Sequence, residues 1–299
     1  MAADYREEPC KAALHHARIA RMGKLWTLNP YTGCVHRCTF CYVRGFERRA
    51  ERPSDERYGA SIRVKTNIAA VLRRELRRSS WNRETVTIGT ATDPYQPAEG
   101  RYRLTRACIE ELLRATTPIG IITRGPLVVR DVDVLAGASS RVDVRVNISI
   151  GTLDERIWRT TEPATAPPRQ RLRAVRTLVE AGIQCGVSVA PILPGLSDSP
   201  EQLEAVVRAA RDAGATHMWG NTLNLRPGTR EHFLECLARD WPEQLARYTE
   251  LYERPYLPDD VSAAMKDQLH ELRDRYGIAD RRPRPIVPPP PPAQLAFLL

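Results

Sequence analysis

Short apolar and β-branched runs alternate with segments of helical periodicity along most of the chain, from residue 25 to residue 230. The short runs predict strands, which we expect at residues 25–31, 85–90, 119–123, 142–150, 184–190 and 217–225. Apolar residues spaced three or four positions apart predict the intervening helices, at residues 42–50, 67–78, 104–115, 129–136, 169–181 and 200–212. Strands and helices in this alternation form a parallel sheet with helices outside it. The sequence therefore predicts an α/β fold.

Composition divides the chain into four segments. Residues 1–25 are polar, and we expect a partly helical N-terminal extension there. Residues 26–230 carry the alternating strands and helices, and residues 231–280 show only helical periodicity, which predicts a helical C-terminal appendage. Residues 281–299 form a tail with unbroken proline from 288 to 292, which favours an extended or disordered state.

Several classes of protein are disfavoured by composition. The 299 residues, 42% of them hydrophobic, are enough for a sizeable core, yet no stretch approaches the ~18 uninterrupted apolar residues of a membrane span. The N-terminal residues lack an apolar signal core, so we expect a cytoplasmic protein that contacts no membrane. Seven cysteines, three of them bunched, suit reduced thiols that bind metal better than a disulfide framework.

The formal net charge of +9 comes mainly from arginine. One group of arginines follows the bunched cysteines, at 44, 48, 49 and 52, and another falls on one predicted helix, at 73, 74, 77 and 78. Such groups form either a basic surface that meets nucleic acid or an ordinary solvated helix face, and both interpretations stay open. The sequence shows no interleaved aromatic pattern that would mark a stacking platform for single strands.

The bunched cysteines are Cys34, Cys38 and Cys41, in a C-x3-C-x2-C loop directly after the first predicted strand. Three thiolates so close in sequence can bind one four-iron cluster and leave an iron open, because clusters that only carry electrons use four cysteines. The alternative is a zinc-bearing nucleic-acid-binding module without catalysis, with His36 as fourth ligand. Structural zinc usually takes its ligands as two separated pairs, and no second pair stands out. An iron–sulfur carrier without catalysis is a third hypothesis.

Phe40 precedes the third cysteine. Three further stretches, residues 26–31, 89–97 and 189–195, lie at the ends of predicted strands. Together with the cysteine loop these stretches resemble the radical S-adenosylmethionine (SAM) enzymes, in their spore photoproduct lyase-like branch. The resemblance spans about residues 8 to 230 and implies a partial (β/α)6 TIM-type barrel, a 4Fe–4S cluster on the three cysteines and SAM on the fourth iron. It also implies reductive cleavage of SAM to a 5′-deoxyadenosyl radical, an electron donor of the flavodoxin or ferredoxin type, and a substrate that is unknown, with nucleic acid among the candidates.

The resemblance assigns cofactor-binding roles to seven residues: Phe40, Tyr42, Thr92, Asp93, Arg124, Ser149 and Ala190. The carboxylate of Asp93 would pair with the amino group or the ribose hydroxyls of SAM. The guanidinium of Arg124 would clamp the methionine carboxylate of SAM. Turn capping is the alternative for Thr92 and Ser149, and turn initiation is the alternative for Asp93. Glu162 and Arg171 also match family-like positions, or form a salt-bridged pair.

One position departs from the lyase. There, a cysteine near the end of the second strand returns a hydrogen atom to the product radical, and the matching position in this chain is Thr90. A hydroxyl holds its hydrogen too strongly to act as that donor. Cys108 and Cys185 fall on a predicted helix and within a strand, where a cysteine is more often a small buried hydrophobe. The sequence therefore identifies no catalytic residue.

Overall fold

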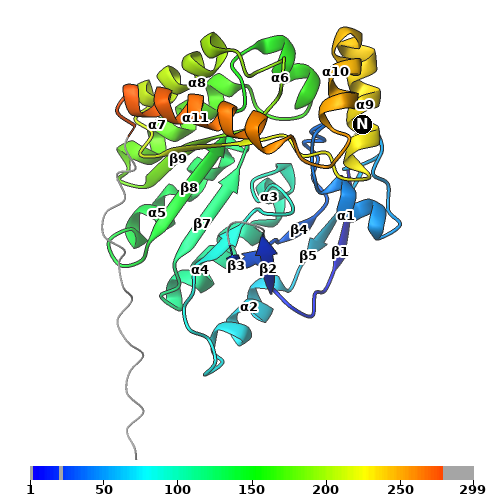
Figure 1. Ribbon diagram of the computed structural model, residues 1–299. Helices are drawn as coiled ribbons and strands as arrows, with labels where there is room; N and C mark the ends of the chain where they lie inside the picture. Colours follow the sequence, from blue (N-terminus) through cyan, green and yellow to red (C-terminus); the bar gives the residue numbers. More distant parts are fainter. Residues whose placement is uncertain (1–2, 20–22, 279–299) are drawn as a thin grey trace, which may run out of the picture.

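A curved sheet of seven strands forms the centre of the protein in a computed structural model that describes residues 3–19 and 23–278 (Figure 1). From one edge to the other, its strands are β10 (Met218–Thr222), β9 (Gln184–Ile192), β8 (Val144–Ser149), β7 (Ile119–Thr123), β6 (Val86–Ile88), β3 (Gly23–Leu28) and β2 (Leu14–Ile19). The six strands from β10 to β3 are parallel, whereas β2 is antiparallel to β3. Within the described chain β10 and β2 are edges that do not pair, so the barrel stays open, as predicted.

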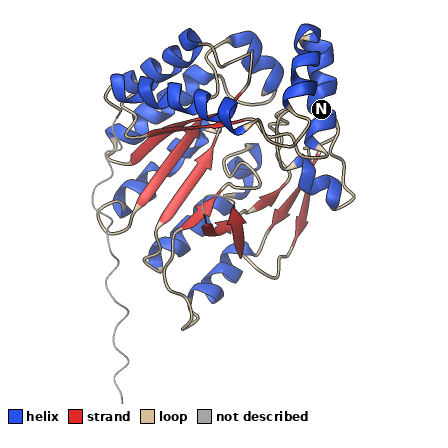
Figure 2. Cartoon of the chain, in the orientation of Figure 1, coloured by secondary structure: helices blue, strands red, loops and turns tan. Residues whose placement is uncertain are grey.

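Helices follow the parallel strands and surround the sheet (Figure 2). The crossover helices are α2 (Ile68–Leu76), α4 (Leu104–Arg114), the 3-10 turn η1 (Pro126–Asp131) with α5 (Val132–Ala138), α7 (Pro168–Glu180) and α8 (Pro200–Asp212). Helix α8 shows why they form, because its buried residues recur at helical spacing and the Ser199 side chain accepts from Gln202 N at its start. Two short helices, α3 (Pro97–Tyr102) and α6 (Glu155–Thr161), lie in the loops at the C-terminal strand ends.

Each parallel strand presents one face to the helices and the other to the concave side of the sheet. On β8, Val144, Val146 and Ile148 are at most 2% exposed and belong to the main core. Asn147 and Ser149 alternate with them and therefore point to the concave side. The concave side of the strands from β8 to β10 thus carries polar side chains, and this is the side that opens toward the predicted site.

The N-terminal segment differs from the prediction. Residues 3–19 contain two strands and no helix, so the expected partly helical extension is wrong for this described part. Strand β1 (Asp4–Glu8) pairs with β5 (Ser61–Lys65), which also pairs with β4 (Tyr31–Thr32), in a small second sheet beside the large one (Figure 1). The partner of β1 lies far along the chain, so local periodicity could not reveal the pairing.

The predicted C-terminal helices are present as α9 (Thr229–Asp240), the 3-10 turn η2 (Pro242–Gln244), α10 (Leu245–Leu251) and α11 (Asp259–Arg275). Helix α11 packs on edge strand β10, because Ser262 bonds Thr222 at 3.0 Å and Leu269 lies over Gly220. Helix α9 begins beside α1 (Arg44–Arg49), where Arg48 pairs with Glu231. The proline-rich tail lies outside the described residues.

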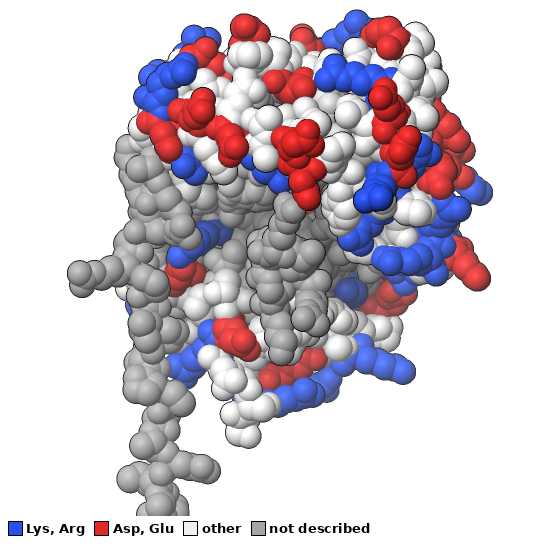
Figure 3. All heavy atoms as spheres, viewed as in Figure 1, with Lys and Arg blue, Asp and Glu red and all other residues white. Residues whose placement is uncertain are grey.

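Charge alone does not define a functional face of the protein. No helix in residues 3–19 and 23–278 combines the length and apolar character needed to cross a bilayer. Acidic and basic side chains are interspersed over the helices at the top of the face in Figure 3. The net charge of +9 therefore does not by itself identify a binding surface, and local groups of charge have to be considered one by one.

Candidate functional site

The cysteine loop, residues 33–43, joins β4 to α1 at the C-terminal end of the barrel strands. Cys34 and Cys38 are buried, Cys41 is half-buried, and all three are free thiols. Burial raises the pKa of Cys38 and of Cys41, and the neighbouring cysteines of the loop raise it further. The structure thus brings the three predicted ligands together in one enclosed place.

Arg44 organises the backbone of this loop. Its side chain is 1% exposed, and its guanidinium donates to the carbonyl oxygens of Cys38 (3.2 Å), Arg37 (3.2 Å), Ser54 (2.8 Å) and Asp55 (2.5 Å). The same group lies 4.6 Å from the centre of the Tyr58 ring. Arg44 is therefore a structural cation, not part of the basic surface that the arginines after the cysteines suggested.

Gln96 fixes the start of the loop from the other side. Its side-chain oxygen accepts from Val35 N at 3.1 Å, and its amide nitrogen donates to Gly33 O at 3.1 Å. Thr92 donates from Oγ1 to the same Gly33 oxygen at 2.6 Å and accepts from Gln96 at 2.8 Å. The hydroxyl hydrogen of Thr92 is thereby committed to the cysteine loop, and this contact places the residue at the site without showing a bond to a ligand.

The described residues give the zinc alternative no support. In the part of the chain that the structure describes, no three His, Cys, Asp or Glu side chains are arranged to hold a single metal ion. Zinc needs its four ligand atoms about 2.0–2.3 Å from one point, whereas each cysteine of a four-iron cluster binds a different iron and can lie farther from the others. His36, the proposed fourth zinc ligand, has its Nδ1 3.3 Å from Asp93 Oδ2 and also contacts Cys34.

Asp93 is buried at the end of the loop after β6, and protein donors surround its carboxylate. Oδ1 accepts from Tyr95 N at 2.9 Å and from Thr123 Oγ1 at 2.6 Å, and Oδ2 accepts from Arg124 N at 2.7 Å. Burial would raise the pKa of Asp93, but His36 and these hydrogen bonds lower it to about 2. Asp93 therefore links β6, β7 and the cysteine loop as a carboxylate that is ionised near neutral pH, beyond the turn initiation that Pro94 suggested.

Arg124 follows β7 and spans the top of the barrel. Its Nη2 donates to Ala190 O at 2.7 Å, and its guanidinium carbon lies 5.4 Å from the centre of the Phe40 ring. Burial would lower the pKa of Arg124, but the charges of Glu162, Cys38 and Asp93 raise it, so the guanidinium stays charged beside the cysteines.

The hydrogen bonding of Arg124 Nε shows how these residues fit the implied cofactor. This atom is buried, lies 3.5 Å from Glu162 Oε1, and forms no hydrogen bond within the described residues. Glu162 itself is held by Arg171, whose Nη2 lies 2.5 Å from Glu162 Oε2, so the salt-bridged pair is confirmed. A guanidinium N–H that forms no hydrogen bond, in a group whose charge is felt by Cys38 and Cys41, fits an anionic ligand such as the carboxylate of SAM.

The remaining predicted residues lie around this point. Ser149 Oγ bonds Ser188 Oγ at 3.0 Å on the concave face, and its carbonyl oxygen accepts from Arg171 at 2.9 Å. Tyr42 is 41% exposed, and its hydroxyl donates to Thr90 O. Thr90 Oγ1 accepts from Asn29 Nδ2 at 3.1 Å. Thr90 therefore lies at the mouth of the site, where it offers a hydroxyl and not a thiol.

A group that sequence reasoning missed lies deeper on the concave face. Trp219 on β10 donates from Nε1 to Asn147 Oδ1 on β8 at 2.9 Å, and His217 Nε2 lies 3.0 Å from the same oxygen. Both side chains reach across β9, where Gly186 makes room, because a Cβ there would lie 2.4 Å from the His217 ring. The indole is 37% exposed. The sequence signal that could have indicated this group is the alternation of polar with apolar residues along β8 and β10.

The orientation of the Asn147 amide follows from hydrogen-bond chemistry. An indole N–H can only donate, so the amide oxygen must face Trp219 and the amide nitrogen must point away from it. Over residues 3–19 and 23–278, that nitrogen forms no hydrogen bond. The concave face thus offers a flat aromatic surface and one fixed N–H donor next to Ser149 and Ser188.

The other four cysteines lie away from this face. Cys108 and Cys185 are fully buried among apolar residues, as predicted, and Cys185 belongs to the helix-facing row of β9 because it pairs in register with Val146. Cys10 N bonds Asn67, and Cys236 Sγ lies 3.6 Å from His232 Nε2 on α9. In the described chain no thiol beyond the three of the loop reaches the concave face.

Comparison with known proteins identifies what this arrangement is similar to. The family model of the Radical SAM superfamily matches residues 28–210. An uncharacterised protein of Mycobacterium tuberculosis (strain H37Rv) is 41% identical over 284 residues, which are 94% of this chain and 84% of that protein. An uncharacterised protein of Acidianus two-tailed virus is 31% identical over 265 residues, covering 85% of this chain and 80% of the viral protein.

Solved structures of spore photoproduct lyase share the fold. The complex with dinucleoside spore photoproduct superposes with a TM-score of 0.64, covering 91% of this chain and 79% of the lyase, at 16% identity. A mutant lyase with bound AdoMet and the same photoproduct superposes with a TM-score of 0.62 and covers 88% of this chain and 77% of that one. At this identity the likeness concerns the fold.

Proposed function

Because the chain belongs to the radical SAM superfamily, we propose that it is an enzyme that binds a 4Fe–4S cluster through Cys34, Cys38 and Cys41 and SAM beside it. When bound, this pair supplies reductive cleavage of SAM to a 5′-deoxyadenosyl radical, and the protein orients it and excludes water. The electron would come from a flavodoxin- or ferredoxin-type donor. The reaction product is not assigned, because Thr90 stands where spore photoproduct lyase has its hydrogen-donating cysteine.

The observation that carries this proposal is the position of Arg124. Its buried Nε lacks a hydrogen bond within the described residues, while its charge acts on Cys38 and its plane lies against Phe40. Arg124 would donate to the carboxylate of SAM, with Glu162 and Ala190 O holding the guanidinium in place. Asp93 would act as a positioning residue that fixes His36 and the backbone N–H of Arg124.

Phe40, Tyr42, Thr92, Ser149 and Ala190 would complete the wall of the cofactor site. Phe40 would pack beside the adenine and the cluster, and the exposed ring of Tyr42 would cover them from the outside. Thr92 would hold the cysteine loop through Gly33, and Ser149 would present its hydroxyl from β8. These are the roles that the family resemblance implies for the five residues.

The substrate would lie on the concave face below the cofactor. Trp219 offers a flat surface 37% exposed, and Asn147 offers an N–H donor whose direction Trp219 fixes. Together they suit a planar ring with a carbonyl acceptor, which is the chemistry of a nucleobase. This supports a nucleic-acid or nucleoside substrate over an aliphatic one.

The test of the proposed function is production of 5′-deoxyadenosine. Protein with an anaerobically reconstituted cluster, treated with dithionite and SAM, should form this nucleoside, and the Cys34→Ala variant should form none. A zinc module or an electron carrier would form none in either case. If protein with about four irons per chain fails to produce 5′-deoxyadenosine, the enzymatic proposal is wrong.

A further inference from the structure

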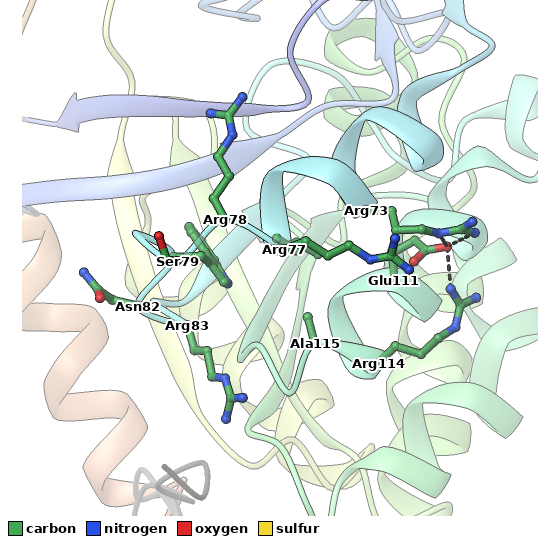
Figure 4. Close-up of a pocket in the computed structure, with 11 residues that line it drawn as sticks. Arg73, Arg77, Arg78, Ser79, Asn82, Arg83, Glu111, Arg114 and Ala115 are labelled. Atoms are coloured by element: carbon green, nitrogen blue, oxygen red, sulfur yellow. Dashed lines mark hydrogen bonds and ion pairs between the residues drawn. The ribbon is translucent and has the colours of Figure 1, made fainter. Parts of the chain in front are cut away.

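A pocket lies at the opposite end of the barrel from the cysteines. It has a volume of about 960 Å³ and is formed by the end of α2, the segment before β6, and the end of α4 (Figure 4). This segment precedes β6 and Ala115 precedes β7, so the pocket lies at the N-terminal strand ends. It is therefore separate from the site that follows the C-terminal strand ends.

The pocket is strongly basic. Five arginines line it with a single carboxylate, Glu111; the arginines are Arg73, Arg77, Arg78, Arg83 and Arg114. Glu111 Oε1 binds Arg73 Nη2 and Arg114 Nη1, each at 2.5 Å, and so fixes two guanidinium groups at one wall. Figure 4 shows Arg77 reaching toward this pair, while Arg78 extends away from it.

Arg77 and Arg78 supply the uncompensated charge. Both side chains are exposed, and neither forms an ion pair or a side-chain hydrogen bond within residues 3–19 and 23–278. Their N–H groups are therefore available to an anion. The single carboxylate of the pocket is already shared by two other arginines, so it cannot neutralise them.

A row of aromatic rings continues from this pocket. Trp81, which lines the pocket, meets Trp26 on β3 edge-to-face at 5.5 Å between ring centres, and Trp26 meets His16 on β2 at 4.8 Å. Hydrogen bonds hold the indoles, with Trp81 donating to Thr117 Oγ1 at 3.2 Å and Trp26 donating to Glu84 Oε2 at 2.6 Å. The row leads from the arginines to edge strand β2, and it brings together rings that are far apart in sequence.

We propose that this arginine–tryptophan surface, Arg77, Arg78 and Trp81 with Trp26 and His16, binds single-stranded nucleic acid. Guanidinium groups bind phosphates through paired N–H donors, and half-buried aromatic side chains stack on bases, so a basic groove with aromatic rings suits a single strand. An isolated phosphate would use the arginines but not the rings. The inference deepens the proposed function and rests on it only for the role of the bound strand as substrate.

Binding without turnover tests this surface. A fluorescent oligothymidylate of about 20 nucleotides is titrated into the cluster-reconstituted protein at salt concentrations from about 50 to 200 mM, and anisotropy gives the Kd. The Arg77→Gln/Arg78→Gln variant should bind roughly tenfold more weakly at the lowest salt, and its log–log salt slope should be smaller by about 1.4, two phosphate contacts at ~0.7 each.

The matched control is Arg169→Gln/Arg173→Gln on α7, which removes the same charge from two exposed arginines elsewhere. It should leave Kd and slope within about twofold of the parent. The Trp81→Leu variant should weaken binding without changing the slope, because it removes stacking and no charge.

Two results would overturn the proposal. One is an equal rise in Kd in the Arg77→Gln/Arg78→Gln and Arg169→Gln/Arg173→Gln variants, which would mean that binding follows net charge. The other is displacement of the strand by low-millimolar inorganic phosphate at constant ionic strength, which would make the pocket a small-anion site. The binding titration does not depend on the formation of 5′-deoxyadenosine. This inference and the proposed function can therefore fail separately.

Discussion

Trp219 on β10 and Asn147 on β8 meet across strand β9, with the indole Nε1 donating to the amide oxygen at 2.9 Å. Gly186, the residue of β9 that pairs with Asn147 in register, carries no side chain and leaves room for the His217 ring, which lies 3.0 Å from the same oxygen. The Trp219–Asn147 bond joins an exposed aromatic ring and an amide into one unit that faces the concave side of the barrel. The proposed substrate position depends on this unit.

Removing the indole of Trp219 should therefore weaken substrate binding and leave the rate of SAM cleavage unchanged. The Trp219→Ala variant should bind thymidine about tenfold or more weakly, because stacking contributes roughly 1–3 kcal/mol per base. Its formation of 5′-deoxyadenosine without substrate should stay within about twofold of the parent. Thymidine binding is measured by saturation-transfer NMR, with deoxyribose as the control ligand that lacks the base. Equal thymidine binding by both proteins would exclude the concave face as the base site.

The Arg124→Gln variant should lose SAM and keep iron. A charge-assisted hydrogen bond to a carboxylate contributes about 1.5–3 kcal/mol, so the Kd for SAM should rise on the order of tenfold to a hundredfold. Iron should remain near four per chain, because Arg124 is not a ligand. Equilibrium dialysis with labelled SAM gives the Kd, and Arg49→Gln, on the exposed side of α1, serves as the control. An unchanged Kd would remove Arg124 from the cofactor site.

The Arg44→Met variant should destabilise the cysteine loop itself. The substitution leaves the buried carbonyl oxygens that accept from Arg44 without their donor, at about 1–3 kcal/mol for each unsatisfied group. We expect the free energy of unfolding in urea to fall by at least about 2 kcal/mol and the iron content after reconstitution to fall with it. Arg49→Met should change neither quantity. Full iron loading of Arg44→Met would show that the loop forms without this cation.

Asp93 should make the cluster-free protein sensitive to acid. Its pKa is about 2 in the folded chain, below the ordinary value of 3.8, so its stabilisation is present above pH ~4 and is lost as the pH falls toward 2. The Asp93→Asn variant should be about 2 kcal/mol less stable at pH 7, and its stability should change less between pH 5 and 2. Urea unfolding at each pH measures both. Parallel pH profiles for parent and variant would contradict the assignment.

The sequence predicted the large sheet because most of its parallel strands are short apolar or β-branched runs. The run at residues 142–150, for example, corresponds to β8 at Val144–Ser149. It did not predict β1, β4 or β5, which are short and pair with strands distant in the chain. Pairing of this kind depends on tertiary contacts, and local periodicity carries no record of it.

Within the site, motif spacing indicated the cysteines and the family resemblance placed Arg124 near them, but neither could assign partners. Arg44 and Arg78 are both arginines in basic runs, yet one is buried under the cysteine loop and the other is exposed at a pocket. Trp81, Trp26 and His16 form a row although no aromatic pattern links them in sequence. Such differences arise from packing between segments, which only the folded chain displays.

The central claim is that three cysteines hold a cluster with one iron open to SAM. Electron paramagnetic resonance of the dithionite-reduced protein tests it most directly, because a ligand on that iron changes the spectrum. We predict a 4Fe–4S signal that shifts on addition of SAM in the parent and shifts far less at the same SAM concentration in Arg124→Gln. A fully loaded cluster whose spectrum is identical with and without saturating SAM would contradict the account.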